Sequence, residues 1–345
     1  MSETTTNPHG IAEGHPDQRP MIVLEGVSKT YPGQTIPAVA ELDLAVPRGS
    51  IVMLVGPSGC GKTTTLKMMN RLIEPTTGRI LLDGEDVTGV NADQLRRRIG
   101  YVIQQVGLFP HFTVGENIAV VPRMLGWDRQ RIRQRVDELL ELVGLHPREF
   151  RDRYPRQLSG GQQQRVGVAR ALAADPPVML MDEPFGAIDP VTRERLHDEF
   201  LEIQRTVRKT ICFVTHDLQE AIKLGDHIAI FTAGGRLAQY DTPEGILSRP
   251  ANDFVAEFVG SGAAVRRLHL IALSTLDLDE IATGSSPTAA ALVTVPLSGS
   301  VYDAVDAMLD AQTSVVAVVD DDGQAVGALR WNTLVEKLQL RGLHP

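Results

Sequence analysis

One stretch of the chain has the residue types and spacing needed to bind a phosphate chain. Residues 56–63 read Gly-Pro-Ser-Gly-Cys-Gly-Lys-Thr, which is the complete pattern of a phosphate-binding loop. Its glycines let the backbone curl until successive N–H groups point at an anion. Lys62 can reach the β- and γ-phosphates, and the hydroxyl of Thr63 can ligate Mg²⁺. The stretch therefore predicts a binding site for a nucleoside triphosphate.

The elements on either side of this loop match that chemistry. Residues 51–55 are an apolar run typical of a buried strand, and residues 64–70 are expected to form a helix. The positive end of that helix dipole would lie beneath the phosphates. The alternative is a glycine-rich turn without a ligand, and the complete motif with both flanks argues against it.

Polar groups follow two further apolar strands. Residues 178–181 end in Asp182 and Glu183, and residues 211–215 end in His216. An apolar strand that delivers an acidic pair suits a P-loop nucleoside triphosphatase, which needs a metal ligand and a group that polarises water. A chance acidic pair and an ordinary satisfied histidine are the alternatives. The carboxyl ends of parallel strands meet beside such a phosphate site, and this favours the functional interpretation.

Composition restricts the class of protein. The 345 residues are 43% hydrophobic and 22% charged, which fits a globular chain of about two domains. A net charge of −9 argues against a nucleic-acid partner. The two cysteines, Cys60 and Cys212, lack metal-ligand spacing and fit a reducing compartment. There is no apolar run of about 18 residues and no apolar signal core, so we expect any role at a membrane to require a partner.

The remaining segments supply the surroundings of the site. Residues 1–20 are polar and aperiodic and are expected to be a disordered tail. Strands are expected at 21–27, at 79–86 with a turn, and at 99–103, where Gln104 follows. Tyr31, in a turn before the loop, could stack on an adenine ring or could simply be a packing residue.

A mostly helical region is expected to follow the strand at 99–103. Residues 106–112 are apolar but broken by Gly and Pro, so they form either a packed loop or an exposed docking surface. Residues 113–150 are predicted to be helical. Within them, 128–143 should form an amphipathic surface helix whose apolar positions are Ile132, Val136, Leu139, Leu140 and Val143. Ser159 is a plausible N-cap for a further helix.

These elements, in this order, resemble the nucleotide-binding subunit of ABC transporters. The resemblance covers about residues 21–260, and its most specific element is Leu158-Ser159-Gly160-Gly161-Gln162, the ABC signature. Residues 185–189 look like the D-loop, with Ile188 where Leu is usual, and Gln157 stands where many members have Glu.

The resemblance implies a role for each site residue. Lys62, Glu183 and His216 would be catalytic, with Glu183 as the base and His216 as the switch histidine. Thr63, Gln104 and Asp182 would hold Mg²⁺. The positions implied to contact ATP are Tyr31, Gly56, Pro57, Ser58, Gly59, Cys60, Gly61, Lys62, Thr63, Thr64, Gln104, Ser159, Gly160, Gly161, Gln162 and Asp189.

The implied fold class is α/β: a P-loop NTPase (RecA-like) ABC domain at 21–260, with a helical subdomain inserted at about 106–170. A signature in that subdomain would lie too far from its own phosphate loop to reach it. It would therefore bind a nucleotide held by another copy, giving a homodimer with sandwiched ATP.

A closer likeness is visible outside the general motifs. Residues 70–76 and 99–111 look like ATPases of quaternary-amine importers, which carry glycine betaine, choline or carnitine. So does the C-terminal extension: after a linker at 261–275, residues 276–345 resemble one CBS repeat. Its helix face would comprise Val301, Ala304, Val305, Met308 and Leu309, followed by strands at 315–319 and 326–329 around a turn at 320–323.

The CBS-like region has a plain alternative, which is a small α/β appendage without a ligand. Thr333 stands where nucleotide-binding repeats often have a ribose-contacting Asp, and only one repeat is present. In a single repeat, Val301, Val305 and Met308 should be partly exposed. We therefore expect residues 276–340 to pair across subunits and to tune the ATPase.

The resemblance predicts an ATPase that powers import of a quaternary-amine osmoprotectant. Its partners would be an integral membrane permease and, indirectly, a periplasmic or extracellular solute-binding protein; its place would be the cytoplasmic face of the membrane. An importer ATPase for another amino acid or small solute is the alternative. A soluble ABC ATPase of translation or DNA repair would be expected to have tandem cassettes, coiled coils or basic arms. A small-molecule kinase would have no use for the signature.

Overall fold

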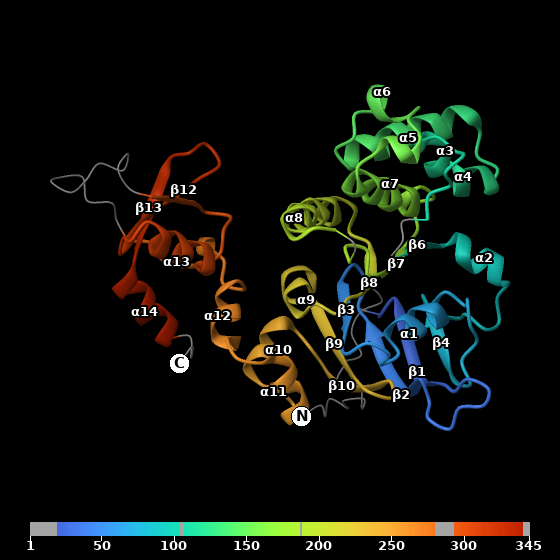
Figure 1. The fold of residues 1–345 in the computed structure, drawn as a ribbon, viewed down its shortest axis with the longest axis horizontal. Coiled ribbons are helices and arrows are strands. Elements are labelled where there is room, and N and C mark those ends of the chain that lie inside the picture. Colours follow the sequence, from blue (N-terminus) through green and yellow to red (C-terminus); the bar gives the residue numbers. More distant parts are fainter. Residues whose placement is uncertain (1–18, 104–106, 187, 280–292, 341–345) are drawn as a thin grey trace, which may run out of the picture. The chain divides into compact units, whose positions relative to one another are not determined.

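The computed structural model describes residues 19–103, 107–186, 188–279 and 293–340 (Figure 1). The chain divides into two compact units, Met1–Thr242 and Pro243–Pro345. Within the described ranges, every helix is too short or too polar to cross a bilayer.

A six-stranded sheet forms the centre of the first unit. Its order is β10-β9-β3-β8-β7-β6, and the strands are β3 (Ile51–Val55), β6 (Ile99–Val102), β7 (Val178–Asp182), β8 (Thr210–Val214), β9 (His227–Thr232) and β10 (Arg236–Asp241). Only the β9–β10 pair among these is antiparallel. Every residue of β3 and β8 is buried, as expected for parallel strands covered on both faces. The strands predicted at 51–55, 99–103, 178–181 and 211–215 are confirmed to within two residues.

A four-stranded antiparallel sheet packs on the same core. Its order is β2-β1-β4-β5, with β1 (Ile22–Lys29), β2 (Val39–Val46), β4 (Thr77–Leu82) and β5 (Glu85–Asp86). Apolar side chains of both sheets and of helix α1 (Lys62–Met69) belong to one buried cluster. Helix α1, which follows the phosphate loop, thus shares a core with both sheets. The strands predicted near 21–27 and 79–86 are confirmed, whereas β2, β9 and β10 were not predicted.

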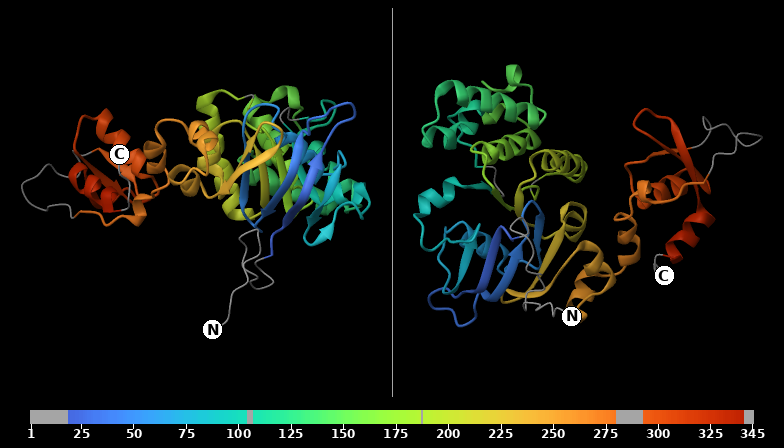
Figure 2. Two further views of the ribbon diagram at one scale, coloured as in Figure 1. Left: turned by 90° about the horizontal axis from the view of Figure 1, so that it is seen from below. Right: turned by 180° about the vertical axis from the view of Figure 1, so that it is seen from behind.

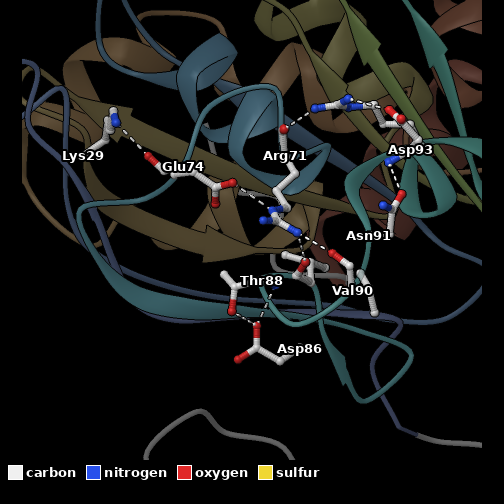
Figure 3. Close-up of polar contacts among 10 residues, drawn as sticks. Lys29, Arg71, Glu74, Asp86, Thr88, Val90, Asn91 and Asp93 are labelled. Atoms are coloured by element: carbon white, nitrogen blue, oxygen red, sulfur yellow. Dashed lines mark hydrogen bonds and ion pairs between the residues drawn. The ribbon is translucent and has the colours of Figure 1, made fainter.

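A polar network joins the end of α1 to α2 (Ala92–Arg97) (Figure 3). Arg71 has a left-handed backbone, with φ 51°. Its side chain donates to Glu74 Oε1 at 2.8 Å and to the carbonyls of Val87 and Val90. Arg96 Nη2 donates to the carbonyl of Arg71 at 2.7 Å. Because α2 leads directly into β6, this network fixes the start of that strand relative to the phosphate-loop helix.

A group of helices lies between β6 and β7 in the sequence. In Figure 1 and in the right-hand view of Figure 2 they gather away from strands β1–β5. They are α3 (Val114–Ile118), α4 (Val120–Met124), α5 (Arg129–Leu142), α6 (Pro147–Phe150), the 3₁₀ helix η2 (Pro155–Gln157) and α7 (Gly160–Leu172). In α5, Asp128 is the N-cap. The five apolar positions predicted for the 128–143 helix are all buried, so that amphipathic helix is confirmed.

Two helices follow β7 and β8. They are α8 (Pro190–Val207) and α9 (Leu218–Leu224). Asp189 is the N-cap of α8 and Asp217 is the N-cap of α9. Both helices therefore begin within a few residues of the polar strand ends described above.

The second unit contains a three-stranded sheet and short helices. Its elements are α10 (Pro243–Ser248), α11 (Asp253–Val259), α12 (Ala263–Leu268), the 3₁₀ helix η3 (Leu273–Thr275), β11 (Thr294–Pro296), α13 (Val301–Asp310), β12 (Val315–Val319), β13 (Ala325–Arg330) and α14 (Trp331–Leu340). β12 pairs with β11 in parallel and with β13 antiparallel. The predicted helix, strands and turn of 301–329 are confirmed. The stretch at 261–275, predicted to be a linker, holds α12 and η3.

Two expectations for α13 are wrong. Leu309 is 66% exposed, because it lies in the last turn, about 100° around the helix from Met308, and points off the core. Val301 and Met308 are only 0% and 2% exposed. They pack with Leu273 and Leu276 as well as with the sheet. The unit therefore covers most of this helix face with its own chain. The predicted exposure of Val301 and Met308 does not occur, whereas Val305 is half-buried, as predicted.

Candidate active site

The loop between β3 and α1 needs glycine at specific positions. Gly61 has φ 97°, and a Cβ there would lie 2.2 Å from the carbonyl oxygen of Ala38. A Cβ at Gly56 would lie 2.4 Å from the carbonyl oxygen of Phe231. Gly61 is also the N-cap of α1, and glycine has no side chain that could satisfy the first N–H groups of the helix. Those N–H groups therefore remain available to bind an anion.

Lys62 is folded over this loop. Its side chain is buried, and Nζ donates to the carbonyls of Gly56 at 2.7 Å and Pro57 at 3.0 Å. Two backbone carbonyls therefore hold the ammonium group at the loop. This places one positive charge beside the predicted position of the phosphates.

The structure brings Thr63 and Asp182 together. Thr63 Oγ1 donates to Asp182 Oδ1 at 2.8 Å, which joins the first turn of α1 to the end of β7. Burial raises the pKa of Asp182, and the hydrogen bond from Thr63 partly opposes that shift. A hydroxyl and a carboxylate are hard oxygen donors of the kind that Mg²⁺ prefers. The pair therefore fits the predicted metal position.

Mg²⁺ commonly completes its shell with phosphate oxygens and water. The part of the chain that the structure describes holds no cluster of three or more His, Cys, Asp or Glu able to bind a metal ion unaided. The Thr63–Asp182 pair therefore suits a metal that arrives with a nucleotide.

Glu183 and His216 face each other at the ends of two neighbouring parallel strands. His216 Nδ1 lies 3.3 Å from Glu183 Oε2. Glu183 has φ 44°, and its N–H donates to the carbonyl of Val214 at 3.0 Å. Its side chain is 24% exposed, whereas that of His216 is 60% exposed. The carboxylate is thus partly shielded and adjacent to Asp182, where it can polarise a water molecule beside the phosphates.

The signature segment forms the start of α7. Ser159 Oγ accepts from the N–H of Gln162 at 3.3 Å, and Gln162 Oε1 accepts from the N–H of Ser159 at 3.0 Å. This capping box confirms Ser159 as the N-cap. A Cβ at Gly160 would meet nothing within 4 Å, so the helix start is open. Within the described residues, no hydrogen bond joins residues 158–162 to residues 56–63.

The remaining predicted site residues have varied positions. Tyr31 is half-buried in the turn after β1, with Lys29 Nζ 5.4 Å from its ring centroid. Asp189 Oδ1 accepts from the N–H of Thr192 at 3.0 Å, and this bond holds the pKa of Asp189 below its usual range. Thr64 is half-buried in α1. Gln104 lies outside the described residues.

Sequence reasoning did not single out three polar residues close to this site. They are Arg193 and His197 on α8 and Glu220 on α9. His197 and Glu220 are both buried. The only available signal was a histidine between the apolar positions Leu196 and Phe200, which by itself is more typical of an ordinary core histidine.

Comparison with known proteins agrees with this geometry. Residues 39–186 match the family model described as ABC transporter. The chain is 50% identical over 313 residues to the osmoprotectant import ATP-binding protein OsmV of Salmonella typhimurium, covering 90% of this chain and 79% of that one. It is 49% identical over 300 residues to the glycine betaine/carnitine/choline transport ATP-binding protein OpuCA of Bacillus subtilis, covering 87% and 76%.

Solved structures share the fold. The dimeric, post-hydrolysis ATP-binding cassette MJ0796 bound to ADP and Pi matches with a TM-score of 0.57 and 35% identity, covering 65% of this chain and 99% of that one. The cbiO1 protein of Clostridium perfringens, part of the cbiONQ ABC transporter complex, matches with a TM-score of 0.63 and 25% identity, covering 73% and 96%. The chain therefore belongs to the ABC transporter family, as one of its ATP-hydrolysing ATP-binding proteins.

Proposed function

We propose that this chain powers the import of a quaternary-amine osmoprotectant of the glycine betaine, choline and carnitine class. The observation that carries the proposal is its 50% identity, over 79% of the relative's length, to a protein named for osmoprotectant import. A spermidine/putrescine import protein of Acidothermus cellulolyticus is 48% identical, but the match covers 72% of this chain and 64% of that one. The match to the osmoprotectant import protein covers more of both chains than the match to the polyamine import protein, and we therefore favour an osmoprotectant as the solute.

The site residues support a direct route for ATP hydrolysis. The loop N–H groups and Lys62 would bind the β- and γ-phosphates. Thr63 and Asp182 would hold Mg²⁺, which neutralises charge on the phosphates when bound. Glu183 would polarise the attacking water, and His216 would orient the Glu183 carboxylate to which it lies close.

A second copy of the chain would complete each site. The open start of α7 at Ser159 and Gly160 has N–H groups and a positive dipole end, but it makes no hydrogen bond to the phosphate loop in the described residues. We infer that it binds the γ-phosphate of ATP held by the other subunit. ATP would then link two subunits into a head-to-tail homodimer, and its hydrolysis would let the subunits separate.

A cleft in the first unit supports docking of a membrane permease. Its volume is about 350 Å³, and it is lined by residues that include Arg96, Tyr101, Phe109 and Val120. The buried Asn117 donates to the carbonyls of Phe109 and Phe112, both at 3.1 Å. This leaves the two aromatic side chains 46% and 38% exposed. A rigid loop with two exposed rings beside a cleft is a surface that suits a partner protein.

The permease would bring the chain to the cytoplasmic face of the membrane, and an external solute-binding protein would act only through the permease. We further propose that residues 21–260 are the ATPase domain and that 276–345 are a CBS-like regulatory domain. In the latter, Thr333 Oγ1 donates to Asp279 Oδ2 at 3.1 Å, and Arg330 Nη1 lies 3.2 Å from the same oxygen. With its hydroxyl engaged in this way, Thr333 is a poor ligand for a ribose.

Transport by the reconstituted complex tests the proposal. The chain is purified with its permease and binding protein in liposomes, and uptake of labelled glycine betaine, choline, carnitine and proline is measured. We expect ATP-dependent uptake of at least one of the first three, and none with Glu183→Gln. Uptake of proline alone would overturn the solute class. ATPase activity that is indifferent to the permease would overturn the role in transport.

A further inference from the structure

A buried pair of ionisable side chains joins helices α8 and α9 behind the active site. His197 Nε2 lies 2.8 Å from Glu220 Oε1, and the two side chains are 3% and 6% exposed. Removing such groups from water is unfavourable, and apolar residues of similar volume often stabilise a fold equally well. The contribution of the pair to stability therefore does not account for its presence.

The surroundings of His197 define its hydrogen bond. Its Nδ1 atom is buried and has no hydrogen-bond partner among the described residues. The imidazole therefore makes its hydrogen bond through Nε2, to Glu220 Oε1. The pair is a directed hydrogen bond that fixes the rotamers of both side chains.

One end of the pair anchors the segment that carries His216. Glu220 is in the first turn of α9, and its N–H and that of Gln219 bond to Asp217 Oδ1 at 3.4 and 2.8 Å. The N–H of Asp217 in turn donates to Thr215 Oγ1 at 3.0 Å. Fixing the position of Glu220 therefore also fixes the first turn of α9. That turn then fixes the backbone at His216.

The other end contacts the segment that follows Glu183. The ring of His197 packs edge-on against Phe185, with 5.1 Å between centroids. Phe185 is buried and also packs on Phe200 and Phe213. Residues of both segments, Glu183, Phe185, His216 and Glu220 among them, line one small cavity. The pair thus touches the chain on both sides of the Glu183–His216 contact.

Helix α8 also holds the D-loop segment through a second residue. Arg193 Nη2 donates to the carbonyl of Ile188 at 2.8 Å. Arg193 lies one helical turn before His197, so both side chains project from the same face of α8. One rigid helix face therefore holds the segments that follow Glu183 and His216.

We propose that His197 and Glu220 are a positioning pair that sets His216 against Glu183 for ATP hydrolysis. This proposal rests on the roles of Glu183 and His216 proposed above. Neither member of the pair contacts the nucleotide; they act by fixing the geometry of the two residues that do the chemistry. Removing the outer partners of metal-ligating side chains typically costs about 10- to 100-fold in metal affinity or activity, and we expect a loss of activity of this size here.

The test separates positioning from stability. In His197→Leu, a buried carboxylate loses its partner, so both thermal midpoint and turnover should fall. The double variant His197→Leu/Glu220→Met removes both polar groups and should recover the thermal midpoint. We expect its kcat in the reconstituted transporter to remain about 10- to 100-fold low, with KM for ATP near the wild-type value. His197→Gln keeps a donor toward Glu220 and should regain most of the turnover.

Recovery of kcat together with the thermal midpoint in the double variant would overturn the proposal, because the pair would then be purely structural. If that variant does not fold, His197→Phe/Glu220→Leu, which keeps a ring against Phe185, decides the question in the same way. The matched control is Glu202→Met/Arg205→Met, an exposed pair on the same helix, which should leave kcat unchanged. His216→Ala is assayed in parallel. Wild-type turnover in that variant would overturn the role of His216 itself, which is a different failure.

Discussion

Helices α1 and α7 both begin at glycine-rich segments, yet their first turns are built differently. At α1 the N-cap is a glycine without a side chain; Lys62 and Thr63 begin the helix, and Thr63 is hydrogen-bonded to Asp182. At α7 the N-cap is Ser159, whose hydroxyl already satisfies one donor through a capping box. The first start is a nearly complete phosphate site within one chain. The second offers donors and a dipole but brings neither the lysine nor the acidic residue.

The space around the glycine at the start of each helix also differs. The carbonyl group of Ala38 and a methyl group of Val39 crowd Gly61, whereas the space around Gly160 is open. The loop at α1 must therefore exclude a side chain to keep its own shape. The start of α7 has room, and that room suits a group that arrives from outside the chain. A helix N-terminus thus becomes a full phosphate site only with charged groups around it, and the start of α7 lacks them, which is the basis of our proposal that it acts on nucleotide bound by a partner subunit.

The largest expected effect lies at the complete site. Glu183→Gln removes the base while leaving Lys62, Thr63 and Asp182 in place, so turnover should fall by about 10²–10⁴-fold. ATP binding should persist, and the variant should accumulate as an ATP-bound dimer in size-exclusion chromatography. Glu202→Gln, at an exposed position on α8, is the matched control. Undiminished turnover in Glu183→Gln would remove this residue from the mechanism.

A matched pair of alanine substitutions probes the difference between the two helix starts. Gly61→Ala places a Cβ 2.2 Å from a backbone oxygen at φ 97°, and such strain costs on the order of 1–3 kcal/mol. It should lower the thermal midpoint and abolish ATP binding by the isolated chain. Gly160→Ala should leave both unchanged and reduce only the turnover of the dimer. Equal loss of ATP binding in the two variants would contradict the distinction drawn here.

Mixing two inactive subunits tests whether α7 acts on its partner. Lys62→Ala damages the phosphate loop, and Gly160→Asp places a negative charge at the start of α7. In a head-to-tail mixed dimer both lesions fall on one composite site, so the other site is intact. Partial recovery of ATP hydrolysis is therefore expected. Failure to recover, once mixed dimers are shown to form, would place both helix starts in one chain's site.

The smallest expected effect concerns the second unit. Deleting residues 264–345 should leave the basal ATPase rate of the assembled transporter within the same order of magnitude and flatten its dependence on ionic strength. The reason is the acidic turn at 320–322, whose repulsion salt would screen. Asp320 Oδ1 accepts from the N–H groups of Asp322 and Gln324 at 3.1 and 2.8 Å, so this carboxylate is held in the turn. An unchanged salt profile would exclude a sensing role for the unit.

Four strands of the parallel sheet, β3, β6, β7 and β8, were predicted because strands buried on both faces read as apolar runs. β3 and β8 are the clearest examples. β9 was missed although its central residues are also apolar and buried. β2 and β10 escaped prediction, because they include half-buried or exposed residues and mix apolar with charged side chains. Such strands are specified by their neighbours more than by their own sequence.

Among the site residues, those that belong to short sequence motifs were predicted, and those that meet only in the folded chain were not. The motifs located Lys62, Thr63, Asp182, Glu183 and His216, because each lies at the end of a strand or the start of a helix. They did not reveal His197 and Glu220, which are 23 residues apart in sequence and meet only because α8 packs on α9. Leu309 was misplaced for a different reason: it lies at the edge of the apolar face, in the last turn of α13, and points off the core.

The outer strand of the four-stranded sheet has a consequence for how copies of this protein can meet. β5 is only two residues long, and both are acidic. Arg98 pairs with Glu85 at 2.6 Å, and hydrogen bonds from Thr88 keep the pKa of Asp86 below its usual range. A short, charged rim of this kind discourages strand-to-strand joining between molecules, and with it aggregation. This edge therefore helps to keep copies of the protein from joining through their sheets, and it leaves other surfaces for the dimer contact that we propose.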